Sequence, residues 1–353
     1  MTRICIYLLR SSAVHSILTC FFLPLFCNNC QAQLSDQIIP ISKSVSGQVA
    51  QDYIFITPSS LNNNSSHPTT LEILDSVGNP IFFKPFTDKT SAPYSSVAVS
   101  DFKLQPSGLM SYTYKLHNGN RAMYLLDSNF VIVDSIECIN GASTDGHDLI
   151  HLPNGSFHLV GLKEKPMDLS SLTTKTGGTG VVNGIVIDQV IQRFDAQKNL
   201  LFEWEVLNHI PLGDTYSHFF KDSARLDHSH YNSIDIDTDG NYLLSFRHLH
   251  EITKVDSSTG QIIWRFWGKQ NQFTFVGDNM PFSGQHYAKR LANGNLLLFD
   301  NGAYNSTPQA RAIEYQLDET NMTATAVWQF KEPNGVSSKF AGNAHRLSNG
   351  NTL

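Results

Sequence analysis

The stretch that decides the fold is residues 147–159, which read His-Asp-Leu-Ile-His-Leu-Pro-Asn-Gly-Ser-Phe-His-Leu. Two apolar runs flank Pro-Asn-Gly, and Asn-Gly between apolar runs is the strongest short signal for an antiparallel hairpin. In the turn that Asn-Gly favours, both central residues take positive φ, so we expect this of Asn154 and Gly155. The same strand–turn–strand pattern recurs along the chain. Its turn glycines are Gly108, Gly155, Gly240, Gly294 and Gly350.

A second hairpin pattern alternates with the first. An apolar strand reaches an Asp, a short polar turn follows, and the next strand is often closed by Trp, as in Phe202-Glu-Trp-Glu-Val. Two hairpins make a four-stranded antiparallel unit, and such a unit repeated at roughly 45–60 residues is typical of β-propeller blades. The aspartates of this pattern are Asp75, Asp127, Asp195, Asp256 and Asp318.

These repeats predict an all-β chain, a six-bladed β-propeller whose sixth blade is truncated in this chain. A β-sandwich with many hairpins is the alternative, but sandwiches rarely repeat one hairpin pair five times. We expect the blades to begin at Tyr53, Phe102, His147, His230 and His286, with the sixth starting near Asn343.

Residues 1–32 have the layout of a secretory signal peptide. Arg3 and Arg10 precede an apolar run over 17–27, and small residues come before a cut after Ala32. The run is too short to span a bilayer, and no later segment is long enough, so we expect no membrane span. Residues 33–52 are then a lead-in segment and residues 53–353 the propeller domain. The protein is expected to be exported and to be periplasmic or secreted.

Charge and cysteine content narrow the class further. The 353 residues carry a formal charge of −6, which argues against a nucleic-acid partner, because such proteins neutralise phosphates with excess Lys and Arg. Of the 5 cysteines only Cys138 lies outside the predicted signal peptide. No internal disulfide can therefore form, and the fold must depend on its core.

Two insertions separate the hairpins that turn at Gly155 and Gly240. Residues 163–185 are rich in Ser, Thr and Gly, and we expect a mobile loop there. Residues 207–227 are rich in His and aromatic residues, which favours a functional loop.

The candidate functional residues recur at the same position in successive blades, the start of the first strand. The first strand of a propeller blade lines the central channel, so residues at the start of these strands converge although they are far apart in sequence. Histidine stands there in three blades, as His147, His230 and His286. Arg247 and His248 follow the second strand of the fourth blade. The sequence therefore predicts a shared cationic site, flanked by His228 and Asn232.

Two kinds of chemistry fit such a site. His228 and His230 stand two apart on a predicted strand and would share a face, as metal ligands do. Against a metal, Arg247 would place a permanent cation among the ligands. Alternatively Arg and His hold the oxygens of a sulfuryl or phosphoryl group while a neutral imidazole attacks it. Aromatic side chains suited to an aryl leaving group are Tyr216, Phe219, Phe220, Phe273, Phe275 and Tyr287.

An ordered set of motifs resembles the bacterial arylsulfate sulfotransferase (aryl-sulfate sulfotransferase, ASST) family from about Tyr53 to the end. The motifs are Asp-Gly-His-Asp-Leu-Ile at 145–150, His-Tyr-Asn-Ser-Ile at 230–234, Ser-Phe-Arg-His at 245–248 and Gln-His-Tyr-Ala-Lys-Arg-Leu-Ala-Asn-Gly at 285–294. The resemblance implies an exported six-bladed propeller that moves a sulfuryl group from an aryl sulfate ester to a phenol. It also implies that no nucleotide donor, metal or other cofactor takes part.

By the same resemblance, His286 matches the histidine that is transiently sulfated. His147, His230 and Arg247 match catalytic groups around the sulfate, and Asn232 matches a binding residue. We add His228 and His248, which stand in the same polar clusters, as candidate substrate-binding residues. The implied mechanism is ping-pong, and the expected partners are a small-molecule aryl sulfate donor and a phenol acceptor.

The chain departs from larger family members, which carry a separate β-domain before the propeller. Residues 33–52 leave no room for one, and the sequence gives no signal for an oligomeric state. The alternative function is a non-catalytic exported propeller that binds an anionic or aromatic ligand. A third hypothesis, a sulfatase, would release free sulfate even with excess phenol.

Overall fold

The computed structural model describes residues 7–8, 52–58, 69–86, 99–116, 119–333 and 335–353. They form two compact units. Unit one runs to Ile136 and includes His345–Leu353, and unit two is Glu137–Ala344. Most of the predicted signal peptide and lead-in segment, 1–32 and 33–52, lies outside the described residues. Among the residues that are described, no helix is long and apolar enough to cross a membrane.

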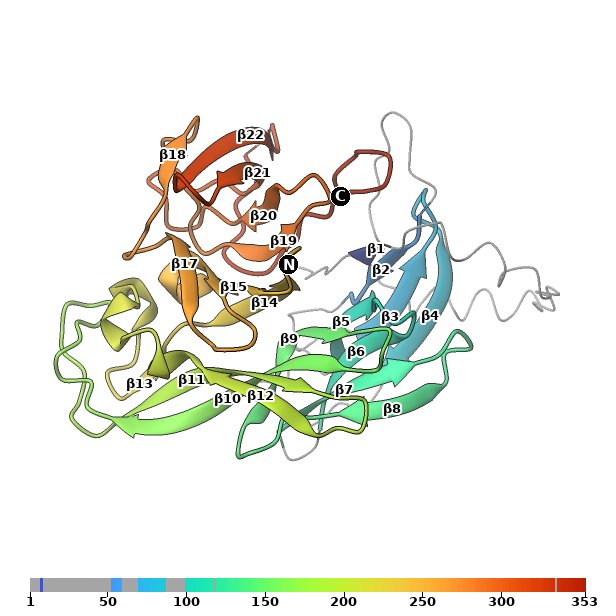
Figure 1. Cartoon of the computed structure of the whole chain (residues 1–353), viewed down its shortest axis with the longest axis horizontal. Coiled ribbons are helices and arrows are strands. Elements are labelled where there is room, and N and C mark those ends of the chain that lie inside the picture. Colours follow the sequence, from blue (N-terminus) through green and yellow to red (C-terminus); the bar gives the residue numbers. More distant parts are fainter. Residues whose placement is uncertain (1–6, 9–51, 59–68, 87–98, 117–118, 334) are drawn as a thin grey trace. The chain divides into compact units, whose positions relative to one another are not determined.

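Unit one contains two four-stranded antiparallel sheets, with strand orders β1-β2-β3-β4 and β5-β6-β7-β8 (Figure 1). Its core includes Phe55, Leu71 and Phe102. β1, which lies within the predicted signal peptide, pairs with β2 in the described chain, whereas we expected the first blade to begin at Tyr53. The strands are β1 (Tyr7–Leu8), β2 (Ile54–Ile56), β3 (Thr69–Leu74), β4 (Pro80–Phe86), β5 (Val99–Leu104), β6 (Met110–Lys115), β7 (Arg121–Leu126) and β8 (Ile132–Ile136).

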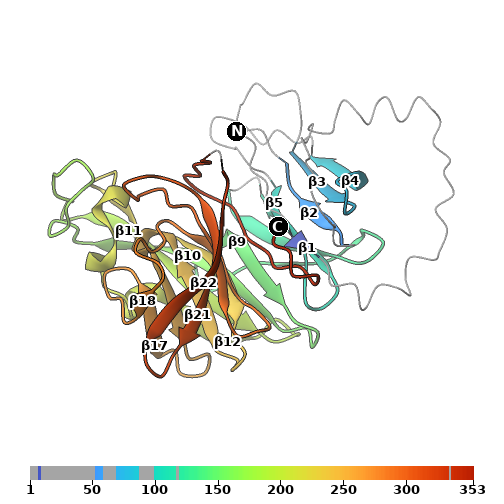
Figure 2. The same cartoon turned by 90° about the horizontal axis from the view of Figure 1, so that it is seen from above.

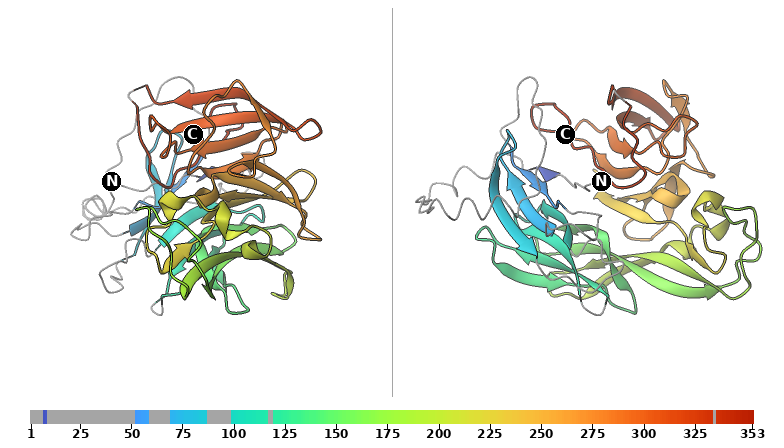
Figure 3. Two further views of the ribbon diagram at one scale, coloured as in Figure 1. Left: turned by 90° about the vertical axis from the view of Figure 1, so that its left-hand side faces the viewer. Right: turned by 180° about the vertical axis from the view of Figure 1, so that it is seen from behind.

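Unit two contains three sheets, ordered β9-β10-β11-β12 with β13 parallel to β11, then β14-β15-β16-β17, then β19-β20-β21-β22-β18. Figure 2 shows β21 beside β22, and Figure 3 shows the sheets of this unit from two further sides. The strands are β9 (Ser143–His151), β10 (Phe157–Met167), β11 (Gly184–Phe194), β12 (Leu200–Glu205), β13 (Arg225–Asp227), β14 (Tyr231–Ile236), β15 (Tyr242–Phe246), β16 (Glu251–Val255), β17 (Ile262–Trp267), β18 (Thr274–Val276), β19 (His286–Arg290), β20 (Leu296–Asp300), β21 (Arg311–Asp318) and β22 (Thr323–Lys331). The 3₁₀ turns are η1 (Val206–Asn208), η2 (Leu212–Asp214), η3 (Ser217–Phe219) and η4 (Arg247–Leu249).

The described chain is all-β, in five sheets of the kind that forms propeller blades. No sixth sheet forms among the described residues. The segment His345–Leu353 makes a hairpin, in which Arg346 pairs with Thr352.

The hairpin turns lie where the sequence predicts them, but their type differs. Gly155 has a φ of +81°, whereas Asn154 is not among the residues with positive φ. The Gly155 N–H donates to the Leu152 carbonyl at 2.9 Å, which closes a type I turn with Pro153 and Asn154 at its centre. Only the glycine needs the left-handed region, so the expectation of two positive φ angles is wrong.

The first strands of the three sheets in unit two lie side by side, with β14 between β9 and β19. Asp148 Oδ2 accepts the Ile234 N–H at 3.0 Å, and Ser233 Oγ accepts the Ala288 N–H at 3.0 Å. The pairing register shifts at the start of β14 and of β19, as in a β-bulge. Bulges of this kind re-aim side chains next to active sites. The starts of these strands therefore converge, as predicted.

The first insertion is shorter than predicted. Strand β10 continues to Met167 and β11 begins at Gly184, and these two residues pair in the sheet. Lys163 and Lys165 form ion pairs with Glu205 across the same sheet. Between these strands Leu169 is fully buried and packs in one cluster with Phe220 of the second insertion. The prediction of a single loop over 163–185 is therefore wrong at both ends.

Candidate active site

His286, the first residue of β19, has both ring nitrogens hydrogen-bonded. Its Nδ1–H donates to Asn301 Oδ1 at 2.6 Å and faces the Gly284 carbonyl at 3.1 Å. The backbone N–H of Ala341 donates to Nε2 at 3.1 Å. A backbone N–H can only donate, so Nε2 must hold a lone pair and the proton must sit on Nδ1. His286 is thus a neutral imidazole with its unprotonated nitrogen toward Ala341.

Burial, together with the charges around it, keeps His286 neutral. Burial lowers the pKa of His286 to about 3, although its hydrogen bond to Asn301 acts in the opposite direction, and Arg247, His147 and His230 lower it further. These groups act on His286 because they lie close to it. The structure thus brings together the four residues that the sequence singled out as catalytic, while their roles stay predictions.

His147 and His230 are each held by a carboxylate. The His147 Nδ1–H donates to Asp145 Oδ1 at 2.5 Å, and the His230 Nδ1–H donates to Asp227 Oδ2 at 2.5 Å. The two imidazoles meet edge to face, with ring centroids 5.3 Å apart. A carboxylate at Nδ1 fixes the tautomer and stabilises the imidazolium when it forms. Both rings are therefore prepared to hold and release a proton.

The partner aspartates are strongly acidic. Burial alone would raise the pKa of Asp227, but the charge and hydrogen bond of His230, with His248 and Gln189, bring it well below its usual range. Burial of Asp145 is outweighed in the same way by His147, so the pKa of Asp145 is lowered. Both carboxylates remain ionised at neutral pH, and each imidazole faces a full negative charge.

His230 has strained backbone geometry. Its φ is +46°, in the left-handed region that residues other than glycine rarely adopt. Such strain costs about 1–3 kcal/mol and clusters at functional sites. The bend directs the His230 ring toward Asp227 and away from the strand that follows.

Arg247 is fixed by several neighbours. His248 donates its Nδ1–H to the Asp227 carbonyl at 2.7 Å, so its Nε2 accepts from Arg247 Nη1 at 3.1 Å. Arg247 Nη2 donates to the Lys339 carbonyl at 2.8 Å, and the guanidinium lies 4.9 Å from the centre of the Phe219 ring. That His248 binds substrate stays a prediction; in the structure its Nε2 accepts from Arg247 and helps to orient the guanidinium.

Two buried polar atoms at the site have no hydrogen-bond partner among the described residues: Arg247 Nε and Asn232 Oδ1. The amide nitrogen of Asn232 donates to the Gln285 carbonyl at 2.6 Å, beside His286. A buried donor or acceptor without a partner is costly unless a ligand or water satisfies it. Both atoms are therefore candidates for contact with a bound anion or phenol.

His228 does not reach the site. It is fully buried, with Nδ1 at 2.7 Å from Thr215 Oγ1 and Nε2 at 3.1 Å from the Ile210 carbonyl. It also lies between β13 and β14 rather than on a strand, so it does not share a face with His230 as predicted. Both ring nitrogens bond to protein, and His228 therefore anchors the second insertion.

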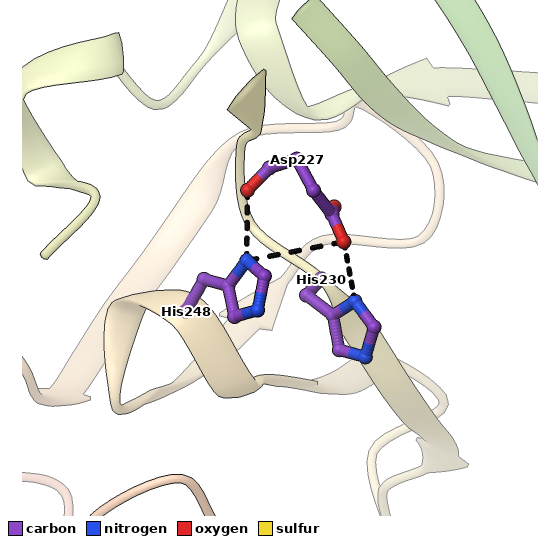
Figure 4. A group of neighbouring side chains, drawn as sticks. All are labelled: Asp227, His230 and His248. Carbon is purple, nitrogen blue, oxygen red and sulfur yellow. Dashed lines mark hydrogen bonds and ion pairs between the residues drawn. The ribbon is translucent and has the colours of Figure 1, made fainter. Parts of the chain in front are cut away.

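Asp227, His230 and His248 form a cluster with the spacing of a metal site, their ligand atoms all lying within 4.8 Å of one another. Figure 4 shows that Nδ1 of both histidines points at Asp227. The Nδ1–H of His248 is a donor to the Asp227 carbonyl, which leaves no lone pair there for a metal. Hydrogen bonding accounts for the cluster, and these residues do not fit a metal ion.

The aromatic residues expected at the site divide into two groups. Phe219 lies against Arg247 and stacks on His248, with ring centroids 3.9 Å apart, and Tyr216 lies 4.5 Å from His250. Phe273 and Phe275 instead pack into one core cluster of unit two and Phe220 into another with Leu169, so these three are structural.

The sequence analysis assigned no individual role to four residues that contact the site histidines or Arg247. They are Asp145, Asp227, Asn301 and Tyr304. Tyr304 lies 5.9 Å from Arg247 and accepts a 3.4 Å hydrogen bond from Nη2. The Asp-x-His and Asp-x-x-His spacings at 145 and 227 could have indicated the two dyads. No comparable signal pointed to Asn301, which follows a strand 15 residues after His286.

The family assignment follows from the sequence of the site region. The family model for arylsulfotransferase (ASST) matches residues 137–353, which includes every residue of the site. The chain belongs to the arylsulfotransferase family. Membership supports aryl sulfotransferase-type function in general and small-molecule substrates for this ASST member. No curated protein matches it in sequence.

Solved structures similar to this ASST member are found at low identity and low TM-score. One is a Bacteroides caccae protein of unknown function, with 13% identity, a TM-score of 0.46, and coverage of 84% of this chain and 80% of that one. Another is a catalytically inactive virginiamycin B lyase from Staphylococcus aureus with quinupristin, with 12% identity, a TM-score of 0.43, and coverage of 85% and 79%.

Proposed function

We propose that the protein transfers a sulfuryl group from an aryl sulfate ester to a phenol through a sulfated His286. The observation that carries the proposal is the lone pair on His286 Nε2 in a ring of cationic groups. An imidazole with a pKa lowered to about 3 by burial and by Arg247, His147 and His230 is unprotonated at every physiological pH. Its Nε2 therefore keeps the electron pair that a nucleophile needs, and the Ala341 N–H is the group that a substrate must displace.

The surrounding charges suit the three non-bridging sulfuryl oxygens. Negative charge on these oxygens would be met by the guanidinium of Arg247, whose Nε–H is buried and unpartnered, and by the imidazoles of His147 and His230. Donors fixed in advance at a site of developing charge stabilise a transition state at little reorganisation cost. Arg247 is fixed in this way by His248 and Phe219.

The reaction takes two steps. In the first, the Nε2 lone pair forms an N–S bond while the S–O bond to the aryl group breaks. The electron pair leaves on the phenolate oxygen, which takes a proton from His147 or His230. In the second, an acceptor phenol gives its proton back to that imidazole, its oxygen attacks sulfur, and the N–S electron pair returns to Nε2.

The Ala341 N–H contact with His286 Nε2 has to open for this chemistry, while the Ala341 carbonyl and Ser338 can keep their contacts with Asn301. The Ala341 N–H donates a hydrogen bond to His286 Nε2, and the Lys339 carbonyl accepts one from Arg247. A sulfuryl group approaching Nε2 would displace the first contact and compete for the second. Entry of the donor is therefore coupled to opening of the Ala341 N–H contact.

We also propose the finer features that the family resemblance implies. The hairpin His345–Leu353 is taken as the opening of a sixth blade, and residues 1–32 as a signal peptide that directs export to the periplasm or beyond. Support for the blade comes from its turn at Gly350, which repeats the glycine turns that join the first two strands in four of the five sheets.

Incubation of the full chain with 4-nitrophenyl sulfate and excess phenol tests the proposal. We expect 4-nitrophenol release matched by phenyl sulfate formation, with no free sulfate. Free sulfate in excess phenol would indicate a sulfatase. Bound ester without release of 4-nitrophenol would indicate a binding propeller.

A further inference from the structure

The three imidazoles of the site differ in the group that holds Nδ1. His147 and His230 face carboxylates, Asp145 and Asp227, at 2.5 Å each. His286 faces a neutral amide, Asn301, at 2.6 Å. The contrast lies in charge, because all three contacts have nearly the same length.

The orientation of the Asn301 amide is fixed by its other contacts. Its Nδ2 donates to the Ala341 carbonyl at 2.8 Å and to Ser338 Oγ at 3.1 Å. A carbonyl oxygen only accepts, so nitrogen must lie on that side and Oδ1 must face His286. The Ala341 carbonyl orients the Asn301 amide, and the Ala341 N–H donates directly to His286 Nε2. Both contacts therefore favour the His286 tautomer with its proton on Nδ1.

The amide and the carboxylate differ in what happens once Nε2 is sulfated. Attack by neutral His286 gives a sulfo-imidazolium, a cationic ring that keeps its Nδ1 proton. Expulsion of a neutral imidazole from this species is easy. A carboxylate at Nδ1 could take the proton and leave a neutral sulfo-imidazole, which would have to expel an imidazolate anion. An amide oxygen cannot accept that proton as a base.

We propose that Asn301 is a positioning residue that keeps the Nδ1 proton on His286 through both half-reactions. The neutral amide thereby suits His286 to carry the sulfuryl group. The carboxylates of Asp145 and Asp227 suit His147 and His230 to carry protons. This inference rests on the proposed function. In each half-reaction the Nδ1 proton stays on the ring and only the Nε2 electron pair is used and returned.

The charged groups near His286 are consistent with this division. Arg247, His147 and His230 are the groups whose charges act on it, and all three oppose a positive ring. The nearby Asp300 is engaged elsewhere, accepting from Arg311 Nε at 2.8 Å and from the Ser283 N–H at 2.9 Å. The amide is therefore the group that faces the ring proton directly, besides the Gly284 carbonyl.

The decisive variant is Asn301→Asp, which keeps the acceptor and adds a charge. We expect release of one equivalent of 4-nitrophenol per enzyme, then a second half-reaction slowed at least tenfold or so, the scale of second-shell changes. Sulfated His286 should accumulate, and the acidic limb of the pH profile should move to higher pH because a carboxylate favours the protonated ring. Unchanged half-reaction rates would overturn the proposal.

Two further variants separate charge from structure. Asn305→Asp adds the same charge four residues along the same loop, and it should leave the ratio of the two half-reactions unchanged. Asn301→Leu removes the acceptor without adding charge, and it should slow sulfation of His286 itself without trapping the adduct. Trapping by either variant would contradict the role assigned to the amide.

A measurement without substrate keeps this inference separate from the proposed function. In the full chain labelled with ¹⁵N-histidine, the signals absent from His286→Asn belong to His286. Their shifts should report a protonated Nδ1 and an unprotonated Nε2. In Asn301→Leu, which also loses the hydrogen bond that holds the Ala341 carbonyl, a share of the Nε2-protonated tautomer should appear. A protonated Nε2 in the unmodified chain would overturn the inference. Failure to sulfate any histidine would instead overturn the proposed function.

Discussion

Two groups of histidines in unit two differ in what their ring nitrogens contact. At the site, Nδ1 of His230 and of His286 is held by a side-chain oxygen, while Nε2 of His286 contacts only the Ala341 N–H, which a substrate can displace. In the second insertion and beside it, His228 and His250 give both nitrogens to the protein; His250 accepts the Gly284 N–H at 2.7 Å and lies 3.1 Å from His218 Nε2. The role of each histidine is thus set by its partners rather than by its place in the sequence.

His228 and His230 make this contrast within three residues. Burial lowers the pKa of His228 to about 4, and its two bonds hold the insertion, while His230 faces Asp227 in a strained backbone. The following changes should break or sharpen the comparison between site and structural histidines.

The largest effect is expected from His286→Asn, which removes the nucleophile and retains a polar side chain of similar size. Turnover of 4-nitrophenyl sulfate should fall to background, while the thermal unfolding transition stays cooperative. Steady-state kinetics with thermal unfolding of the same sample measure both. Turnover retained within about tenfold would move the nucleophile to another residue.

Arg247→Lys should come next. Lysine keeps the charge but loses the planar fork that His248, Phe219 and the Lys339 carbonyl hold in place. We expect kcat/KM to fall about 10²–10³-fold, as when one preorganised donor is removed from a transition state. An effect below threefold would mean that the guanidinium only balances charge.

Asp227→Asn should lower kcat about 10²-fold, because general acid–base catalysis contributes about 10²–10⁴-fold and the amide cannot stabilise a protonated His230. The loss should be smaller with donors whose phenol leaves readily, since these need less protonation. A plot of rate against leaving-group acidity measures this. Equal loss for all donors would assign Asp227 a purely structural role.

The smallest effect on catalysis is expected from His228→Gln. It should lower the free energy of unfolding by about 1–3 kcal/mol through its lost hydrogen bonds, with kcat per folded molecule unchanged. Urea unfolding followed by fluorescence, with activity of the same sample, measures both quantities. A fall in kcat without loss of stability would show that His228 acts in catalysis rather than in holding the fold.

The same variant tests a pH effect. The pKa of His228 is lowered to about 4 by burial, below its unfolded value of about 6.5, so the unfolded chain binds the proton first as pH falls. The free energy of unfolding should therefore decrease from about pH 6.5 down to pH 4. In His228→Gln this slope should be shallower.

Much of the arrangement was predictable, because the repeated hairpins fix where strands begin and therefore which residues converge. His147, His230, His286 and Arg247 were found in this way. Asn301 and Ala341 could not be, since their contacts with His286 depend on how the chain returns to the site after β20 and β22. His228 was misplaced because burial and the second insertion, not spacing, decide its contacts.

The turn prediction failed for a local reason. Asn-Gly alone favours two positive φ angles, but Pro153 before Asn154 suits a type I turn, in which only Gly155 needs that region. The error leaves the strands in place, because both turns connect the same two runs.

The central claim is that His286 is the covalent carrier, and one measurement tests it most directly. The full chain is mixed with 4-nitrophenyl sulfate without acceptor, quenched at alkaline pH and digested, and the peptides are sequenced by mass spectrometry. We expect one SO₃ group on the peptide containing His286, attached to the imidazole and removed when phenol is added before quenching. A sulfuryl group on His147 or His230 instead, or 4-nitrophenol release with every histidine unmodified, would contradict the account.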